Sequence, residues 1–298
     1  EGLLLHVALR RIPRAIGVIL GVLTVVFALL QLSGDPARLV LPEGAGEQEI
    51  LEVRQRLGLD QPLAVQWWRF VVRAAAGDFG FSYYQGRPAI EVVAEHLPAT
   101  LQLAVSSLTL ALGIGIPLGI WAAVRRRSWV DRLITSTVLV GRSMPTFWVG
   151  IMLILFLGVT LRWLPVSGYG TPAHLVLPSL TLAVYLAPAL SRLVRSSMLE
   201  VLRAEYIRSA RAKGLPEARV LLRHAFKNAS IPVTTMAGLQ LGALLGGAVI
   251  TETVFAWPGV GRLLVVSVQK LDYPVVQAVT ALTATAIVGA LLTVTTAY

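Results

Sequence analysis

The residues of this chain that could take part in chemistry are charged, and many of its cations lie in one stretch. Residues 203–233 read RAEYIRSARAKGLPEARVLLRHAFKNASIPV, whereas the whole chain is 55% hydrophobic and only 14% charged. The cations of this stretch are Arg203, Arg208, Arg211, Lys213, Arg219, Arg223 and Lys227. Such a cluster attracts anionic groups, for example carboxylates of a partner protein or the headgroups of anionic lipids.

Sequence motifs for catalysis are absent. No G-x-x-x-x-G-K-[ST] phosphate loop occurs, because none of the lysines, Lys213, Lys227 and Lys270, stands in the required glycine context. The chain has no cysteine, and its four histidines fall in different segments without the spacing of metal ligands. We therefore expect no catalytic residue, no metal and no cofactor in this chain, so that a partner must supply the energy for any active process.

The elements that must position these charges are apolar. A mean hydropathy of +0.71 is too high for a water-soluble domain of 298 residues, and a helix that crosses a bilayer needs about 20 mainly apolar residues. Six segments fit this requirement: 12–32, 100–124, 133–161, 175–195, 231–256 and 275–297. In the fourth, Arg192 and Arg195 must extend to the membrane interface. The sequence thus predicts an all-α membrane protein with six transmembrane helices.

The distribution of cations between the loops predicts the orientation of these helices. With the N-terminus inside, the internal segments 1–14, 125–132 and 192–227 carry sixteen of the 26 lysines and arginines, and the external segments carry nine. Because positively charged loops stay in the cytoplasm, we expect both termini to be cytoplasmic. The net charge of +10 is then loop charge on a membrane protein, so nucleic acid is not an expected partner.

This topology predicts three parts and one projecting hairpin. The parts are an N-terminal segment with the first helix (1–32), an extracytoplasmic segment (33–97), and a five-helix core (98–298) with a cytoplasmic loop at 199–230. Within that loop, Gly214 suits the left-handed position that ends a helix, and Pro216 suits the start of the next one. A helix–turn–helix of this kind is typical of a docking element, and an amphipathic hairpin lying on the membrane surface is the alternative.

The amino-acid sequence of this loop and of several other stretches resembles that of one known family. The stretches are YIRSARAKG and VLLRHAFKNASIPV in the loop, SGDPARL (33–39), LGLDQPL (57–63), GDFGFSY (77–83), SMPTFWVG (143–150), WLPVSGYG (163–170), LVRSSMLEVL (193–202), ITETVFAWPGVGR (250–262) and DYPVVQA (272–278). In this order they resemble the permease subunits of ATP-binding-cassette (ABC) importers, in particular the dipeptide, oligopeptide and nickel branch. At the three positions of the general Glu-Ala-Ala motif before the loop glycine, Arg208 and Ser209 depart from the motif and Ala210 matches it.

The resemblance implies a fold, a location and a set of partners. It implies the permease fold of a type I ABC importer in the bacterial cytoplasmic (inner) membrane. The partners would be a second permease subunit, two ATP-binding subunits that bind ATP and magnesium, and an extracytoplasmic substrate-binding protein. The hairpin would be the coupling helix that inserts into an ATP-binding subunit. Its contact residues would be Ala210, Arg211, Lys213, Gly214, Leu215 and Pro216.

The same resemblance implies import of dipeptides or oligopeptides, with nickel chelates or glutathione as alternatives.

Two charged residues, Arg142 and Glu252, lie within apolar spans, where charge is costly and usually functional. Pro145 bends the helix that carries Arg142, so we expect Arg142, Ser143, Met144, Pro145 and Glu252 to line the translocation path. Alternatively, Arg142 pairs with a carbonyl group or with Glu252, and Glu252 holds a re-entrant loop near the outer interface.

Glycines in the fifth span predict close helix packing. Gly238, Gly242 and Gly246 follow one another at intervals of four residues, which lets another helix approach. This stripe would contact a second permease subunit or a gating helix, or else another helix of the same chain.

Two other functional classes are open at this point. An ion-gradient-driven transporter would need coupling-ion sites in paired repeats, for which the chain offers only Glu252. A structural assembly factor would have no transport path.

Overall fold

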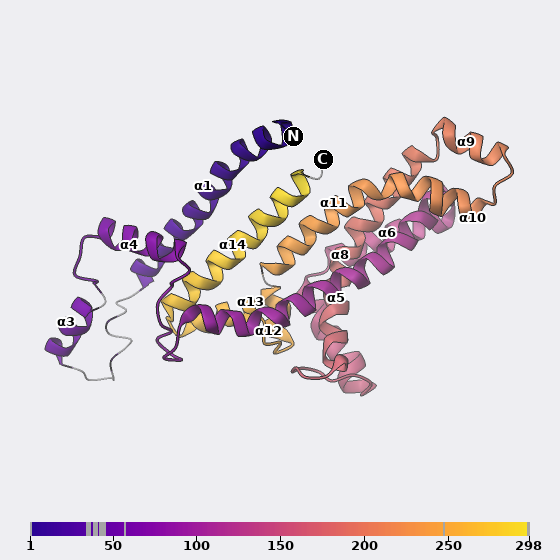
Figure 1. Cartoon of the computed structure of the whole chain (residues 1–298). Coiled ribbons are helices and arrows are strands. Elements are labelled where there is room, and N and C mark those ends of the chain that lie inside the picture. Colours follow the sequence, from indigo (N-terminus) through magenta and orange to yellow (C-terminus); the bar gives the residue numbers. More distant parts are fainter. Residues whose placement is uncertain are drawn as a thin grey trace. The chain divides into compact units, whose positions relative to one another are not determined.

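The computed structural model describes residues 2–33, 37, 41, 46–56, 58–246 and 248–296. These residues are almost entirely helical, and the described part contains one isolated β-bridge, between Phe81 and Pro88 (Figure 1). The chain divides into two compact units. The first comprises Glu1–Thr100, Leu245–Val249 and Pro258–Tyr298, and the second comprises Leu101–Leu244 and Ile250–Trp257.

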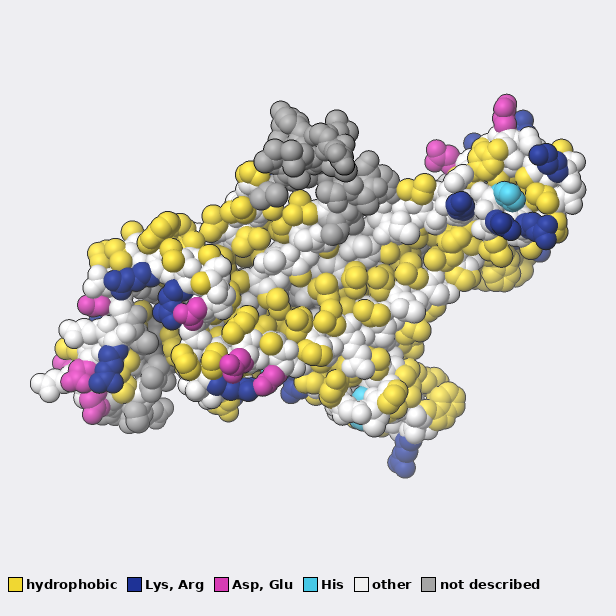
Figure 2. Space-filling model, viewed as in Figure 1, with side chains coloured by type: hydrophobic (Ala, Val, Ile, Leu, Met, Phe, Trp, Pro, Cys, Tyr) yellow, Lys and Arg dark blue, Asp and Glu magenta, His cyan; other side chains and the backbone are white. Residues whose placement is uncertain are grey.

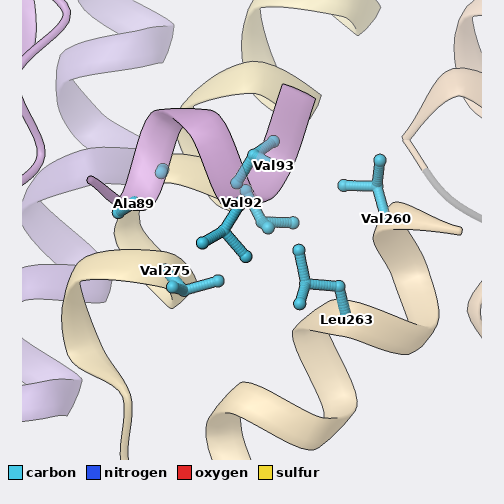
Figure 3. Packing of buried hydrophobic residues seen from close by; sticks show 8 residues of the cluster. Ala89, Val92, Val93, Val260, Leu263 and Val275 are labelled. Atoms are coloured by element: carbon cyan, nitrogen blue, oxygen red, sulfur yellow. The ribbon is translucent and has the colours of Figure 1, made fainter. Parts of the chain in front are cut away.

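The first unit contains two long apolar helices and several short ones. Its helices are α1 (Gly2–Ser33), α3 (Glu47–Arg56), α4 (Leu63–Ala75), the start of α5 (Ala89–Val124), α13 (Val260–Gln269) and α14 (Tyr273–Thr296). Helices α1 and α14 lie side by side (Figure 1). The start of α5 packs against α13 and α14 through buried aliphatic side chains, including Val92, Leu263 and Val275 (Figure 3).

The second unit contains the remaining helices. They are the rest of α5, α6 (Trp129–Ser143), α7 (Thr146–Leu153), the π-helical segment η1 (Ile154–Thr160), α8 (Pro172–Val201), α9 (Glu205–Ala212), α10 (Glu217–Arg219), the π-helical segment η2 (Val220–Ala225), α11 (Phe226–Leu245) and α12 (Val249–Val254). Large apolar side chains are exposed along α7 and η1, including Trp148 and Phe156, as expected of a surface that faces lipid rather than water.

Four described helices are long and apolar enough to cross a membrane: Pro13–Leu32, Ala89–Val124, Pro172–Val201 and Tyr273–Leu292. They correspond to the first, second, fourth and sixth predicted spans. The third predicted span is wrong as a single helix, because α6 ends at Ser143 and α7 begins at Thr146. Proline lacks a backbone N–H and forces the preceding residue out of the helical region, and Met144 accordingly has a ψ of 133°.

The fifth predicted span also differs from the structure. It was expected to run to residue 256, but α11 ends at Leu245 and α12 begins only at Val249. Glycine at position 246 explains the end, since glycine is a poor helix former and favours helix termini. The prediction of three glycines in one helical stripe is therefore wrong: Gly238 and Gly242 belong to α11, whereas Gly246 lies beyond it.

Candidate functional site

The cation-rich loop forms the predicted helix–turn–helix. Helix α9 ends at Ala212, and Gly214 adopts the left-handed conformation with φ = +76°. The N–H of Gly214 donates to the carbonyl of Arg211 (2.9 Å), and the N–H of Leu215 donates to that of Ala210 (3.4 Å). These two bonds are the pattern of a Schellman motif, which a left-handed glycine completes. Pro216 then caps α10, with a ψ of 140°.

An ion pair links the two helices on either side of the turn. The Arg211 guanidinium donates to both carboxylate oxygens of Glu217, at 3.1 and 2.6 Å, so that it joins the end of α9 to the start of α10. This guanidinium lowers the pKa of Glu217 below its ordinary value, because it stabilises the ionised carboxylate. At neutral pH the turn is therefore held by both backbone and side-chain contacts.

The two arms of the hairpin are packed against each other. Ile207 on α9 and Val220 and Ala225 on η2 are fully buried, and the Asn228 amide donates to the Tyr206 hydroxyl at 2.8 Å. The next buried residue along this face, Ala229, follows Ala225 at an interval of four residues, whereas Val220 and Ala225 are five apart. The wider interval fits the i→i+5 bonding of a π-helix.

The tip of the hairpin is a polar, exposed surface. Arg211, Lys213, Gly214 and Pro216 are exposed, and Leu215 is half-buried. Ala210 is only 8% exposed because it packs inside the hairpin, so its side chain presents little surface to a partner. Lysine and arginine side chains gather over the hairpin formed by α9 and α10 (Figure 2). The structure thus brings five of the six predicted contact residues to one projecting turn with at least partial exposure.

The break between α6 and α7 is the second part of the candidate site. Met144 and Pro145 both have extended ψ angles, 133° and 136°, so the backbone leaves the helical hydrogen-bond pattern in the middle of an apolar stretch. At membrane depth such backbone is tolerated only where protein covers it or where it lines a water-filled cavity. Ser143 and Pro145 are exposed, and Arg142 is in the last turn of α6, with its side chain outside the described part.

Glu252 lies elsewhere, inside the second unit. Its side chain on α12 is fully buried. The following residues fix α12 in place: the carbonyl of Phe255 accepts from the N–H of Gly168 at 2.9 Å, and the ring of Trp257 meets that of Tyr169 edge-on at 4.8 Å. In this conformation Glu252 is not at an open surface, so the structure does not bring it together with Ser143 and Pro145 at a described cavity.

Two packing features of the second unit were not predicted. The Arg195 guanidinium donates to both oxygens of Asp131, at 2.7 and 2.8 Å, so Arg195 holds α8 to α6. Gly115 and Gly119 allow α5 to approach α8 closely: a Cβ at Gly119 would lie 2.6 Å from the carbonyl oxygen of Ser191. The four-residue spacing of Gly115 and Gly119 is a usable signal in the sequence, but the run of three such glycines at 238, 242 and 246 favours the fifth span instead.

Long apolar helices, an interruption within an apolar stretch and an exposed cationic hairpin together fit a multi-pass membrane permease. The chain belongs to the binding-protein-dependent transport system inner membrane component family, whose model matches residues 115–298. A second model, for the N-terminal part of such membrane components, matches residues 4–104.

Named relatives and a solved structure agree with this assignment. The chain is 46% identical to the glutathione transport system permease protein GsiC of Salmonella paratyphi A and 45% identical to GsiC of Escherichia coli. Each match covers 92% of this chain and 90% of the relative. A structure of the MetNI methionine ABC transporter in an inward-facing conformation shares the fold, with a TM-score of 0.51 and 21% identity over 63% of this chain and 88% of that one.

These findings establish the class of the protein. It is a multi-pass permease subunit of a binding-protein-dependent ABC importer in the bacterial inner membrane. It is not itself an enzyme, because ATP hydrolysis in such importers belongs to partner subunits.

Proposed function

We propose that this permease carries glutathione, together with a second permease subunit that completes the path. The observation that carries this proposal is the 46% identity, over 92% of the chain, to proteins named as glutathione transport permeases. Dipeptides and oligopeptides are the second candidate, supported by the eight sequence stretches outside the loop that resemble that branch of permeases. Glutathione is itself a short peptide, so the two candidates differ in selectivity rather than in chemistry.

The proposed topology has six crossings with both termini in the cytoplasm, and the proposed parts are 1–32, 33–97 and 98–298. The third crossing, 133–161, would consist of α6 from Leu133 onward, α7 and η1, with the interruption at Met144 and Pro145 on the translocation path. Arg142 and Ser143 would also face the path. The exposure of Ser143 and Pro145, and the cost of irregular backbone in lipid, support this placement.

The hairpin at 199–230 would couple the permease to an ATP-binding subunit. That subunit would bind ATP and magnesium, and a substrate-binding protein would deliver the substrate from the outside. The proposal is supported by the exposed tip, the Schellman motif and the Arg211–Glu217 pair, because a rigid turn can transmit a displacement whereas a flexible loop cannot. Alternating access would follow from movement of this turn with the bundle.

The substrate is tested with the complete importer reconstituted in proteoliposomes. We expect ATP-dependent uptake of radiolabelled glutathione that requires the substrate-binding protein, and weaker competition by unlabelled dipeptides than by glutathione. Uptake of dipeptides with no uptake of glutathione would contradict the glutathione assignment. Uptake by the chain alone, driven by a proton gradient, would contradict the importer mechanism as a whole.

Coupling is tested at the tip of the hairpin. The double variant Lys213→Glu, Gly214→Glu reverses one charge and places a side chain where φ is positive, so we expect uptake and binding of the ATP-binding subunit to fall about tenfold or more. Arg126→Glu is the control, because Arg126 is exposed on another loop that we place on the same side. Membrane insertion of both variants should match that of the parent, and unchanged uptake by the double variant would contradict coupling at this turn.

A further inference from the structure

A pocket outside the transport and coupling features lies in the first unit. It has a volume of about 190 Å³ and opens between α13 and the loop that precedes α5. We call residues 77–88 of this loop the hook. Tyr84 and Gln85 of the hook, His96 of α5, and Arg262 and Lys270 at the two ends of α13 line the pocket. The proposed topology places both the hook and α13 on the extracytoplasmic side.

The wall of the pocket is held by a buried carboxylate. Asp272 is 3% exposed, and its two oxygens accept hydrogen bonds from the hydroxyl of Ser82 and from the backbone N–H of Tyr83. The hydroxyl of Ser82 in turn accepts from the N–H of Gln85 at 2.9 Å. Burial raises the pKa of Tyr83 to about 12, so its phenol stays protonated beside this carboxylate. Asp272 therefore fixes the hook to the α13–α14 junction, and both of its oxygens already accept hydrogen bonds.

The lining of the pocket has an excess of positive charge. Arg262 and Lys270 are eight residues apart and lie on one face of α13, since residues at intervals of four share a helix face. The Lys270 ammonium sits 3.1 Å from the centre of the Tyr84 ring, which orients it at the mouth. Asp272 is the single carboxylate in the lining, and nearby Glu95 is paired with Arg87.

The volume of the pocket and the side chains around it indicate which kind of ligand it can bind. Pockets for whole small molecules are usually about 300–1,000 Å³, so a space of about 190 Å³ suits one side chain rather than a tripeptide. Two aromatic rings of the hook, Phe81 and Tyr84, are 64% and 66% exposed. Aromatic residues and arginine are enriched in protein–protein interfaces, and this surface offers Phe81, Tyr84 and Arg262. Leu263 and Val266 add an apolar floor, which strengthens the attraction of the cations for an anion.

We propose that this pocket is a carboxylate-binding site that receives one Asp or Glu side chain from the protein that docks on the extracytoplasmic face. The carboxylate lies between Arg262 and Lys270, and the rings of Phe81 and Tyr84 cover the backbone that presents it. The inference rests on the proposed function, because it needs the hook outside and a substrate-binding protein as partner. It adds the chemistry of that contact and the residues that make it.

The test measures uptake by the reconstituted importer as a function of the concentration of its substrate-binding protein. In Lys270→Gln and in the double variant Arg262→Gln, Lys270→Gln, we expect the half-saturating concentration to rise, by about tenfold for the double variant, with an unchanged maximal rate. Lys270→Arg keeps the charge and should stay close to the parent. Arg56→Gln is the matched control, because Arg56 is an exposed cation of the same unit that does not line the pocket.

The outcomes separate this inference from the proposed function. If the parent importer takes up glutathione and all variants have the parental half-saturating concentration, the pocket does not bind the partner and the inference is wrong. If the parent takes up no substrate, the proposed function itself fails. A direct check is zero-length carbodiimide crosslinking, in which Lys270 should form an amide with an Asp or Glu of the binding protein. Absence of that crosslink in the docked parent complex would contradict the proposal.

Discussion

Single glycines decide how closely two helices of this permease approach. In α5, a Cβ at Gly119 would meet the Ser191 carbonyl and the Val194 side chain at 2.6 Å, a distance that real Cβ atoms do not tolerate. A Cβ at Gly113 of the same helix would meet nothing within 4 Å. Two glycines that look equivalent in the sequence therefore differ: Gly119 is needed for packing within this chain, whereas a Cβ at Gly113 has room in it.

We predict that Gly119→Ala destabilises the protein by about 1–3 kcal/mol, since overpacking forces α5 away from α8. Gly113→Ala is the matched control and should be neutral or stabilising, because alanine is the better helix former and the site has room. Thermal unfolding of the purified complex in detergent measures both. Equal unfolding temperatures for the two variants would show that the close approach at Gly119 is not maintained in the membrane protein.

At the scale of elements, the most specific contact is the ion pair between α6 and α8. Asp131 is 5% exposed and receives both donors of Arg195, and its oxygens also accept from the N–H of Arg127 and from Thr135. Arg195 stands two turns before the end of α8 at Val201, where the chain enters the hairpin. Movement of the hairpin-proximal end of α8 is therefore tied directly to α6, whose other end is the interruption at Met144.

We predict that Asp131→Asn destabilises the protein by about 1–3 kcal/mol, because a partly buried guanidinium loses its bidentate partner. Arg192→Gln on the exposed side of the same helix is the control and should change little. If the pair transmits motion, Asp131→Asn also lowers uptake per ATP hydrolysed. Parental unfolding temperature and parental uptake together would contradict this role.

The pH dependence of the same contact has a defined sign. Arg195 holds the pKa of Asp131 below its ordinary value, because it stabilises the ionised carboxylate in the folded state. A depressed folded pKa gives a stabilisation that is fully present above the unfolded pKa of about 3.9 and is lost as the pH falls through the lower folded value. Between pH 5 and pH 8 the difference in unfolding temperature between the parent and Asp131→Asn should therefore stay constant.

At the scale of the whole molecule, composition and periodicity were sufficient for the helical class and for four of the six predicted spans. The hairpin was also predictable, because its turn depends on local signals: glycine at the left-handed position and proline at the next cap. The interruption at Met144 was foreseen as a bend, since its cause, Pro145, is a single residue. The end of α11 was missed because an apolar run extends past the glycine at position 246, and hydropathy does not distinguish a helix from a helix end.

The contacts that order the bundle could not be read from the sequence. Asp131 and Arg195 are 64 residues apart, and Ser82 and Asp272 are 190 apart, so nothing local pairs them. The interval of five between Val220 and Ala225 depends on a π-helical segment, which no hydrophobic period indicated. The sites proposed here, the hairpin tip and the hook pocket, therefore differ in kind: the first is a local structure, and the second exists only after folding.

The six-crossing topology is the whole-molecule proposal on which the hairpin and the pocket both depend, and the chain is well suited to testing it. It contains no cysteine, so single cysteines can be introduced without background labelling. We place Glu52→Cys, Trp163→Cys and Gln269→Cys outside, and Arg126→Cys and Arg208→Cys inside. All five parent side chains are exposed, so that a membrane-impermeant maleimide can reach each cysteine from its own side.

The expected result is labelling of the first three cysteines in intact cells and of the last two only after permeabilisation. Trp163 decides the interrupted helix: if α6, α7 and η1 do not cross together, Trp163 stays on the side of Arg126. In the same way, Gln269 and Arg208 report whether α11, the 20-residue helix between them, crosses. Four crossings in place of six would leave Trp163→Cys unlabelled in intact cells and would expose Arg208→Cys to the reagent from outside, whereas Gln269→Cys would be labelled in either case. That outcome would place the hairpin outside and so overturn its coupling to an ATP-binding subunit, whereas the hook and α13 would stay together on the outer side.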